Sequence, residues 1–132
     1  MISDIEEALN AQAALIPGRK AWQGIPFRPD GEPYMAVSMP FRGRQVPGVG
    51  AEARAFWNGV FQILVCNPAR EGVPGASRAA EVAAGFFKRG HTLILGAARV
   101  HIEQVNLPAP VVTADYISVP VQVSWFCEDT PS

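Results

Sequence analysis

The residues that could bind a metal ion or form covalent bonds are few and widely spaced in this sequence. Its two cysteines and two histidines stand 25, 10 and 26 positions apart: Cys66, His91, His101 and Cys127. Structural zinc sites normally take their ligands in closely spaced pairs, because one turn then supplies two of them. We therefore predict no metal centre, and we expect both thiols to be buried and free.

Candidates for nucleophilic or acid–base catalysis also lack a supporting context. Ser77 lacks the second glycine of a nucleophile elbow and stands at the start of a predicted helix, where a capping role is typical. The carboxylates nearest the strand region are Glu103 and Asp115, and nothing in the sequence places them together. His91 and His101 are expected to be exposed or hydrogen-bonded structural residues. The sequence predicts neither an enzyme nor a cofactor.

A glycine-containing stretch over residues 48–53 matches a permissive form of the dinucleotide-binding fingerprint. That fingerprint lies between a strand and a helix whose amino terminus receives the pyrophosphate. Here Pro47 precedes the match and a predicted strand follows it. We therefore expect a turn at this place and no nucleotide site.

The charge of the chain is low both in sum and in density. Among 132 residues, 11 are Lys or Arg and 12 are Asp or Glu, so the net charge is −1. A nucleic-acid binder or a basic membrane-surface module needs a positive excess, which this chain does not have. Charged residues make up 17% of the sequence, against about 25% in an average globular domain. This low density suggests that part of the surface contacts other protein.

Signals for secretion or membrane insertion are also not found in the sequence. The first residues are acidic, whereas a signal peptide begins with a basic region, so we expect the chain to start in the cytoplasm. The best apolar candidate, Val60 to Cys66, is broken by Gln62 and is much shorter than the 18 or more residues that span a bilayer. We predict no transmembrane segment.

Hydrophobic periodicity predicts two helices and five strands in the order α-β-β-α-β-β-β. We expect helices at about 3–15 and 76–88, and strands at 34–41, 55–66, 92–95, 98–105 and 116–126. These elements indicate one α+β domain over residues 1–132, with a mixed, mainly antiparallel sheet of four or five strands and both helices on one face. An extended crossing is expected at 17–33, and a flexible tail at 127–132.

Three features predict where individual strands lie in the sheet. The strand at 55–66 is apolar on both sides, which is typical of a central strand covered on both faces. Pro40 suggests that the strand at 34–41 ends at a sheet edge, since proline cannot donate a ladder hydrogen bond. Pro120 stands in the middle of the strand at 116–126 and favours an edge strand or a bulge, which makes it a candidate interface residue.

The segment 42–54 is expected to be a long exposed loop or a hairpin arm. It contains the one local basic cluster, whose members are candidate interface residues: Arg42, Arg44 and Arg54. With only Glu52 opposing them, these arginines either form a solvated loop or dock on an acidic neighbour. Phe56 and Trp57 follow directly and must point to opposite faces of a strand, so at least one of them could be an exposed anchor.

Aromatic residues, turns and helix ends follow one another in a recognisable order along residues 3–128. The stretches concerned are Ala21-Trp22-Gln23-Gly24-Ile25-Pro26-Phe27, Pro29-Asp30-Gly31-Glu32-Pro33-Tyr34, Gly59-Val60-Phe61-Gln62-Ile63-Leu64-Val65 with Asn67-Pro68 and Gly72, Phe86-Phe87-Lys88-Arg89-Gly90, and Tyr116-Ile117-Ser118-Val119-Pro120-Val121. In this order the sequence resembles the small tail-terminator, or tail-completion, proteins of long-tailed phages and prophages.

That resemblance implies a structural virion protein with no catalytic residue. Such a protein forms a ring, hexameric in the family, on the completed tail tube. It stops tube polymerisation and presents a surface to the head connector. The implied partners are further copies of itself, the tail-tube protein and the connector or head-completion protein, with no sequence-specific nucleic acid and no membrane. The implied location is the virion tail, after assembly in the host cytoplasm.

A different class of protein stays open as the alternative. A small ligand-binding or enzymatic α+β domain could form a pocket between the helix at 76–88 and the sheet. That function would need polar groups converging on the pocket, and the sequence does not show them.

Overall fold

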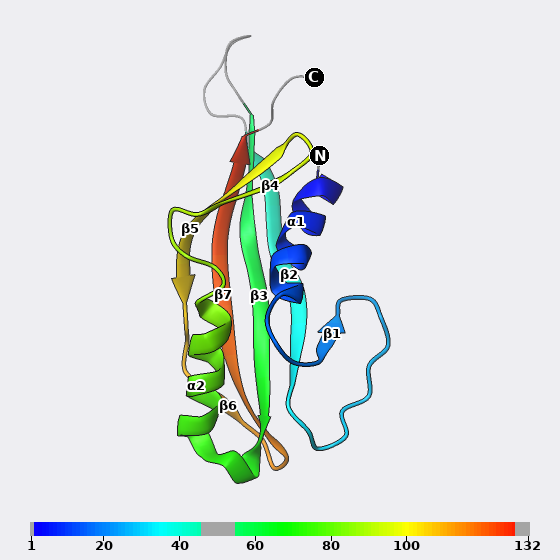
Figure 1. Ribbon diagram of the computed structural model, residues 1–132, viewed down its shortest axis with the longest axis vertical. Coiled ribbons are helices and arrows are strands. Elements are labelled where there is room, and N and C mark those ends of the chain that lie inside the picture. The colour runs from blue at the N-terminus through cyan, green and yellow to red at the C-terminus, as the bar shows by residue number, and fades with distance from the viewer. Residues whose placement is uncertain (1, 46–54, 129–132) are drawn as a thin grey trace.

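A computed structural model describes residues 2–45 and 55–128 of the chain. Figure 1 shows an elongated molecule built on one long sheet. Its elements are α1 (Ile2–Ala14), β1 (Lys20–Trp22), β2 (Tyr34–Gln45), β3 (Phe56–Pro68), a 3-10 turn (Ala69–Glu71), α2 (Gly72–Ala84), β4 (Thr92–Leu95), β5 (Ala98–Asn106), β6 (Val111–Val112) and β7 (Tyr116–Glu128). The α+β class is the predicted one.

The sheet has seven strands in the order β1-β2-β3-β7-β5-β4, and β6 also pairs with β7. Only the β1–β2 pair is parallel among the described strands, so the sheet is mixed and mainly antiparallel as expected. The expectation of four or five strands is wrong. It misses β1 and β6, which are three and two residues long and lie in proline-rich segments without periodicity.

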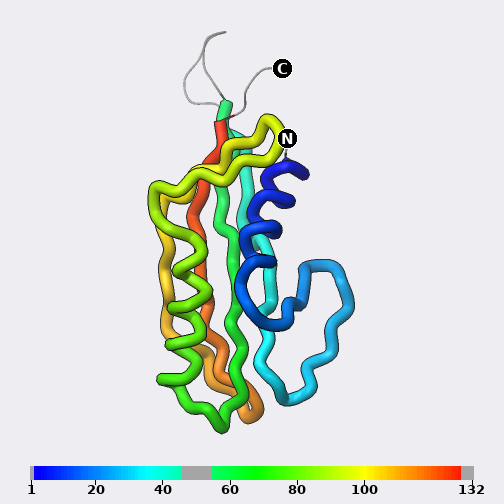
Figure 2. The backbone as a smooth tube through the Cα atoms, viewed as in Figure 1, coloured from blue at the N-terminus to red at the C-terminus, as the bar shows by residue number. Residues whose placement is uncertain are grey.

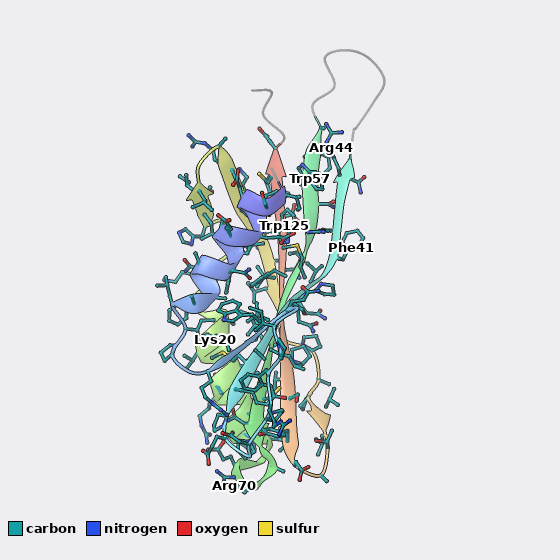
Figure 3. All side chains as sticks on the ribbon, turned by 90° about the vertical axis from the view of Figure 1, so that its right-hand side faces the viewer. Lys20, Phe41, Arg44, Trp57, Arg70 and Trp125 are labelled. Carbon is teal, nitrogen blue, oxygen red and sulfur yellow. The ribbon has the colours of Figure 1, made fainter. Side chains whose placement is uncertain are left out.

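Both helices lie on the same side of the sheet (Figures 1 and 3). The side of each helix that faces the sheet is buried, with Ile5 and Leu9 on α1 and three alanines on α2. Apolar and polar residues alternate along β7, and its apolar face is buried in the core: Ile117, Val119, Val121, Val123 and Trp125. The core therefore fills the space between the helices and this face of β3 and β7.

The opposite face of the sheet is not covered by either helix. β3 lies between β2 and β7, so its predicted central position is correct. The predicted cover on both faces is wrong, because Val60 and Leu64 are only half-buried, by neighbouring side chains of the sheet. Apolar residues on both sides of this strand therefore indicated its central position in the sheet correctly. They did not indicate that a further layer of structure covers its second face.

Each of the two strand prolines lies at an irregularity of the sheet. β2 continues past Pro40 to Gln45, and its register with β3 shifts between Ser38 and Phe41, so Pro40 marks a bulge and not the end of the strand. β7 is an internal strand, which corrects the edge position expected from Pro120. Its partners beyond β3 are β5 opposite residues 122–126 and β6 opposite residues 117–118, and Pro120 lies in the gap between them.

The second helix lies four residues earlier than predicted. α2 begins at Gly72, and Pro74 is tolerated in its first turn because amide donors there need no helical partner. Gly85 ends the helix. Phe87 falls within the predicted helix at 76–88 but lies beyond the end of α2, where it is buried, and Gly90 has a φ of 84° in a later turn. Because the apolar spacing continues past Ala84, the predicted helix included residues that are not helical in the structure.

The crossing at 17–33 forms a wide loop beside β2 (Figure 2). Trp22 packs against the core from β1, and Phe27 packs against Tyr34 with the rings tilted and their centroids 4.9 Å apart. The Gly31 amide donates to the Tyr116 hydroxyl over 2.9 Å, which ties the loop to the start of β7. These contacts hold a segment that has almost no secondary structure of its own.

Candidate assembly surfaces

The described residues hold no group of three or more His, Cys, Asp or Glu side chains that could bind a metal ion. The thiols of Cys66 and Cys127 are buried, as expected. His101 has a structural setting, since its Nδ1 lies 2.9 Å from the Thr92 hydroxyl and its ring stacks on Phe126. Neither described helix is long and apolar enough to cross a membrane.

Arg42 and Arg44 lie within β2 and not in a loop, because the β2–β3 hairpin extends as far as Gln45 and Phe56. Arg42 forms an ion pair with Glu6 of α1, so it joins the hairpin to the first helix. Arg44 is paired in register with Trp57 near one end of the long axis (Figure 3). The remaining residues of the expected arm, Arg54 among them, lie outside the described residues.

Phe56 and Trp57 point to opposite faces of β3, and both are half-buried. Trp57 lies on the helix side in the same register as Cys127, close to Trp125 (Figure 3). The indole nitrogens of Trp57 and Trp125 are buried, and neither has a hydrogen-bond partner among the described residues. Phe56 lies at the end of the uncovered face.

A groove of about 720 Å³ lies beside α1, on the helix side of the sheet. Its wall carries uncharged side chains of α1, of β1 and of the following turn: Asn10, Ala11, Ala14, Trp22, Gln23 and Ile25. Charged groups among the lining residues are Glu6, Glu7 and Arg42, and two of these are the ion pair just described. The groove is therefore mostly neutral.

The alternative function would need a pocket between the second helix and the sheet, and the cavity found there is small and apolar. A cavity of about 200 Å³ lies there, lined by α2, the segment 16–19 and β2. Its polar lining includes Asn67, whose amide already donates to the Gly75 carbonyl over 3.4 Å. Arg19 also lines it but is bonded to Asp30. Among the described residues, we find no set of polar groups converging on this cavity.

The uncovered face, here called the open face, runs across β2, β3, β7 and β5. Cross-strand register assigns its residues: Tyr34, Ala36, Ser38, Phe41 and Gly43; Asn58, Val60, Gln62, Leu64 and Cys66; Ser118, Pro120, Gln122, Ser124 and Phe126; His101, Gln104 and Asn106. None of these is Asp, Glu, Lys or Arg. Charged residues lie at the margins of the face: Glu128 stands at one end, opposite Phe56, and Arg99 stands on β5, two residues before His101 and paired with Ile94.

Two side chains near the crossing have shifted acidities. Burial, with a smaller effect from a hydrogen bond to Cys66, raises the pKa of Tyr34 to about 12. The hydrogen bond from Arg19 lowers the pKa of Asp30, which is exposed at the surface. Both groups keep their usual charge state at neutral pH, so these shifts indicate structural contacts and not catalysis.

Residues 4–125 match the family of phage tail terminator proteins. The chain belongs to this family. The match covers nearly the whole stretch over which the sequence resembled it. None of the curated proteins compared with the chain matches it significantly.

Two solved structures share the fold of this terminator-family chain. One of them has a TM-score of 0.70 at 21% identity over 98% of this chain and 94% of its own. A chain from the virion of a native gene transfer agent (GTA) particle has a TM-score of 0.58 at 20% identity, over 96% and 93% respectively. These similarities extend over the full domain.

For a terminator-family protein, the structure brings together few of the residues singled out in the sequence. Pro120 lies on the open face and Phe56 at its end, whereas Arg42 and Trp57 lie on the helix side. The open face as a whole was not predicted. Its signal was present in the alternation of small and amide side chains along 116–126, but only the register shows that β2 and β5 continue the same surface.

Proposed function

We propose that this chain is a structural protein of a phage tail that caps the completed tail tube as a ring of identical copies, six in number. The ring ends tube polymerisation and forms the joint to the head connector. The observation that carries this proposal is the family match across residues 4–125. The fold shared with a GTA virion chain supports it.

The surfaces of the chain suit such a role better than they suit catalysis. Neighbours in a ring meet through two different surfaces that must be complementary, because the contact closes by rotation. The open face and the neutral groove beside α1 lie on opposite sides of the sheet. Arg44 and Arg70 lie near opposite ends of the long axis, where the tube and the connector would be met (Figure 3).

The experiment is to add the purified chain to polymerising tail-tube protein and to follow tube length by light scattering and negative-stain imaging. We expect tubes that stop growing and carry a ring at one end. Tube protein alone is the control and should keep elongating. Tubes that grow equally long with the chain present, and carry no added density at either end, would overturn the proposal.

The same preparation tests the ring and its size. Mass measurement of capped tube ends should give six copies for each capped end. A single copy, or a compact monomer that never associates with a tube, would contradict a ring. The proposal also places the protein in the virion tail after assembly in the host cytoplasm, which proteomics of purified particles would check.

A further inference from the structure

The middle of the open face lacks charge to a degree that solvent exposure alone does not explain. A soluble protein surface carries charge at roughly a quarter to a third of its positions, and an uncovered face of an antiparallel sheet is normally its polar, solvated side. Here the middle of the face, on β2, β3 and residues 118–126 of β7, holds no charged residue, while Arg99 of β5 and Glu128 of β7 lie at its margins. Apolar side chains, among them Val60, Leu64 and Phe126, lie between the polar ones.

The polar groups of this face also bond to one another. The Gln122 amide donates to the Gln62 carbonyl oxygen over 3.2 Å, across the middle of the face. The Ser118 hydroxyl donates to the Cys66 sulfur over 3.4 Å. His101 is held by Thr92 and stacked on Phe126. Covering such groups leaves few of them without a partner, so the cost of removing their water is low.

The dimensions of the face suit a protein contact. Four strands spaced by about 4.8 Å give a width of about 19 Å, and nine residues rising by about 3.3 Å each give a length of about 30 Å. The flat area is on the order of 600 Å² before side-chain relief is counted, close to the roughly 800 Å² that each partner contributes to a standard interface.

We propose that the open face packs against the helix side of a second copy of this chain, beside α1, an inference that rests on the proposed ring. The chain itself has a surface that could receive the open face of a neighbour. The groove beside α1 is lined by the neutral residues Ala11, Ala14 and Trp22, and it lies on the opposite side of the sheet. A neutral face needs a neutral partner, since a charge buried against it would have no ion-pair partner.

The test substitutes Gln122, at the centre of the face. Gln122→Lys and Gln122→Glu each place a charge where the neighbour packs, and we expect each to weaken assembly at least tenfold in the concentration required. Gln122→Met, of similar size and uncharged, is the matched control and should assemble within about twofold of the natural chain. Circular dichroism and melting temperature confirm that all three fold.

Assembly is measured by light scattering of the free chain. If the free chain is monomeric, image analysis of tube ends measures it instead. Assembly of both charged variants at the natural concentration would overturn the proposal. Loss with Gln122→Glu but gain with Gln122→Lys would also overturn it, because that pattern indicates an anionic partner such as DNA.

Cross-linking tests which surface of the neighbour is met. A variant carrying Ser124→Cys on the open face and Ala14→Cys on α1 should give a ladder of linked oligomers with a short bismaleimide. Each single variant should give none. Dimers from Ser124→Cys alone would show two identical faces in contact, and no linkage in the double variant would show another contact; either result overturns the proposal.

Failure of the inference can be told apart from failure of the proposed function. If the natural chain caps tubes and the charged variants cap them equally well, the ring stands and the open face is not its contact. If the natural chain neither assembles nor caps a tube, the proposed function has failed, and the inference fails with it.

Discussion

Gly59 shows how closely the hairpin and the core are packed at the scale of a single residue. It lies on the helix-facing side of β3, opposite Trp125. A Cβ atom built there would lie 2.8 Å from the Trp125 ring and closer still to the Phe41 carbonyl oxygen. These neighbours are a large buried ring and backbone, which cannot move aside without disturbing both strands. Glycine is therefore required by space and not by backbone conformation.

Gly59→Ala should destabilise the fold by about 3 kcal/mol, because overpacking forces neighbouring groups to shift. Chemical denaturation measures the change. Gly43→Ala is the matched control, since a Cβ at Gly43 meets only the Phe41 ring, 4.0 Å away. The control should stay within about 0.5 kcal/mol of the natural chain. Equal stability of the two variants would contradict the close contact at Gly59.

Tyr34 gives a prediction about alkaline pH. Burial raises its pKa to about 12 in the fold, above the value of about 10 in an unfolded chain. The protonated hydroxyl therefore contributes stability that is fully present below pH 10 and lost as the pH rises towards 12. In Tyr34→Phe, the free energy of unfolding should fall less between pH 10 and 12. Parallel curves for the two proteins would refute this assignment.

At the scale of elements, the β2–β3 hairpin joins the sheet to α1 through Arg42 and Glu6. Both side chains are about half exposed, at 49% and 41%. An exposed pair of this kind contributes about 1 kcal/mol or less, so the hairpin is oriented by its ladder and not by the pair. Its arginines remain candidates for contact with a neighbour.

Replacing Arg42 and Arg44 together by Glu should weaken ring assembly, while the melting temperature falls by only a few degrees. The change places a second carboxylate beside Glu6 and reverses the charge of the hairpin. The Arg42→Ala/Arg44→Ala variant is the control that removes charge without reversing it, and its assembly should be intermediate. Unchanged assembly in the Glu variant would make these arginines ordinary solvated residues.

Pro120 gives a second prediction at this scale. Because it lies in the gap between β5 and β6, its missing amide proton removes no cross-strand hydrogen bond on that side. Pro120→Val should therefore change the free energy of unfolding by about 1 kcal/mol or less. Gln62→Pro, flanked by paired strands on both sides, should destabilise much more. Similar losses in both variants would contradict the gap.

The elements that were predictable are those whose signals are local. The α1 helix and the alternation of β7 follow from periodicity, and both are found close to the expected bounds. The short strands β1 and β6 form only because long neighbours accept their few hydrogen bonds, which no local pattern encodes. The open face needs the order of strands and their register, so sequence reasoning could name Pro120 but not the surface around it.

At the scale of the whole molecule, the charged residues and the helices that cover the sheet are distributed unevenly. The helices lie on one side of a long sheet (Figure 1), and the middle of the other side carries no charged residue. A chain with a net charge of −1 could have spread its 23 charged residues evenly. In the proposed ring, this division gives each copy a largely uncharged open face for one neighbour and a groove beside α1, lined mostly by uncharged residues, for the other.

The place of β7 in the sheet also determines the order in which the fold can form. β7 comes after all the other strands along the chain, yet it lies between β3 and β5 and also pairs with β6. Until β7 is in place, β3 and β5 have no partner on their inner edges, and the two halves of the sheet are not joined. Such pairings between distant segments close long loops, so folding is slow and exposes strand edges that other chains can capture. The open face spanning all four strands exists only after this last pairing, so a partly folded chain cannot present it to a neighbour.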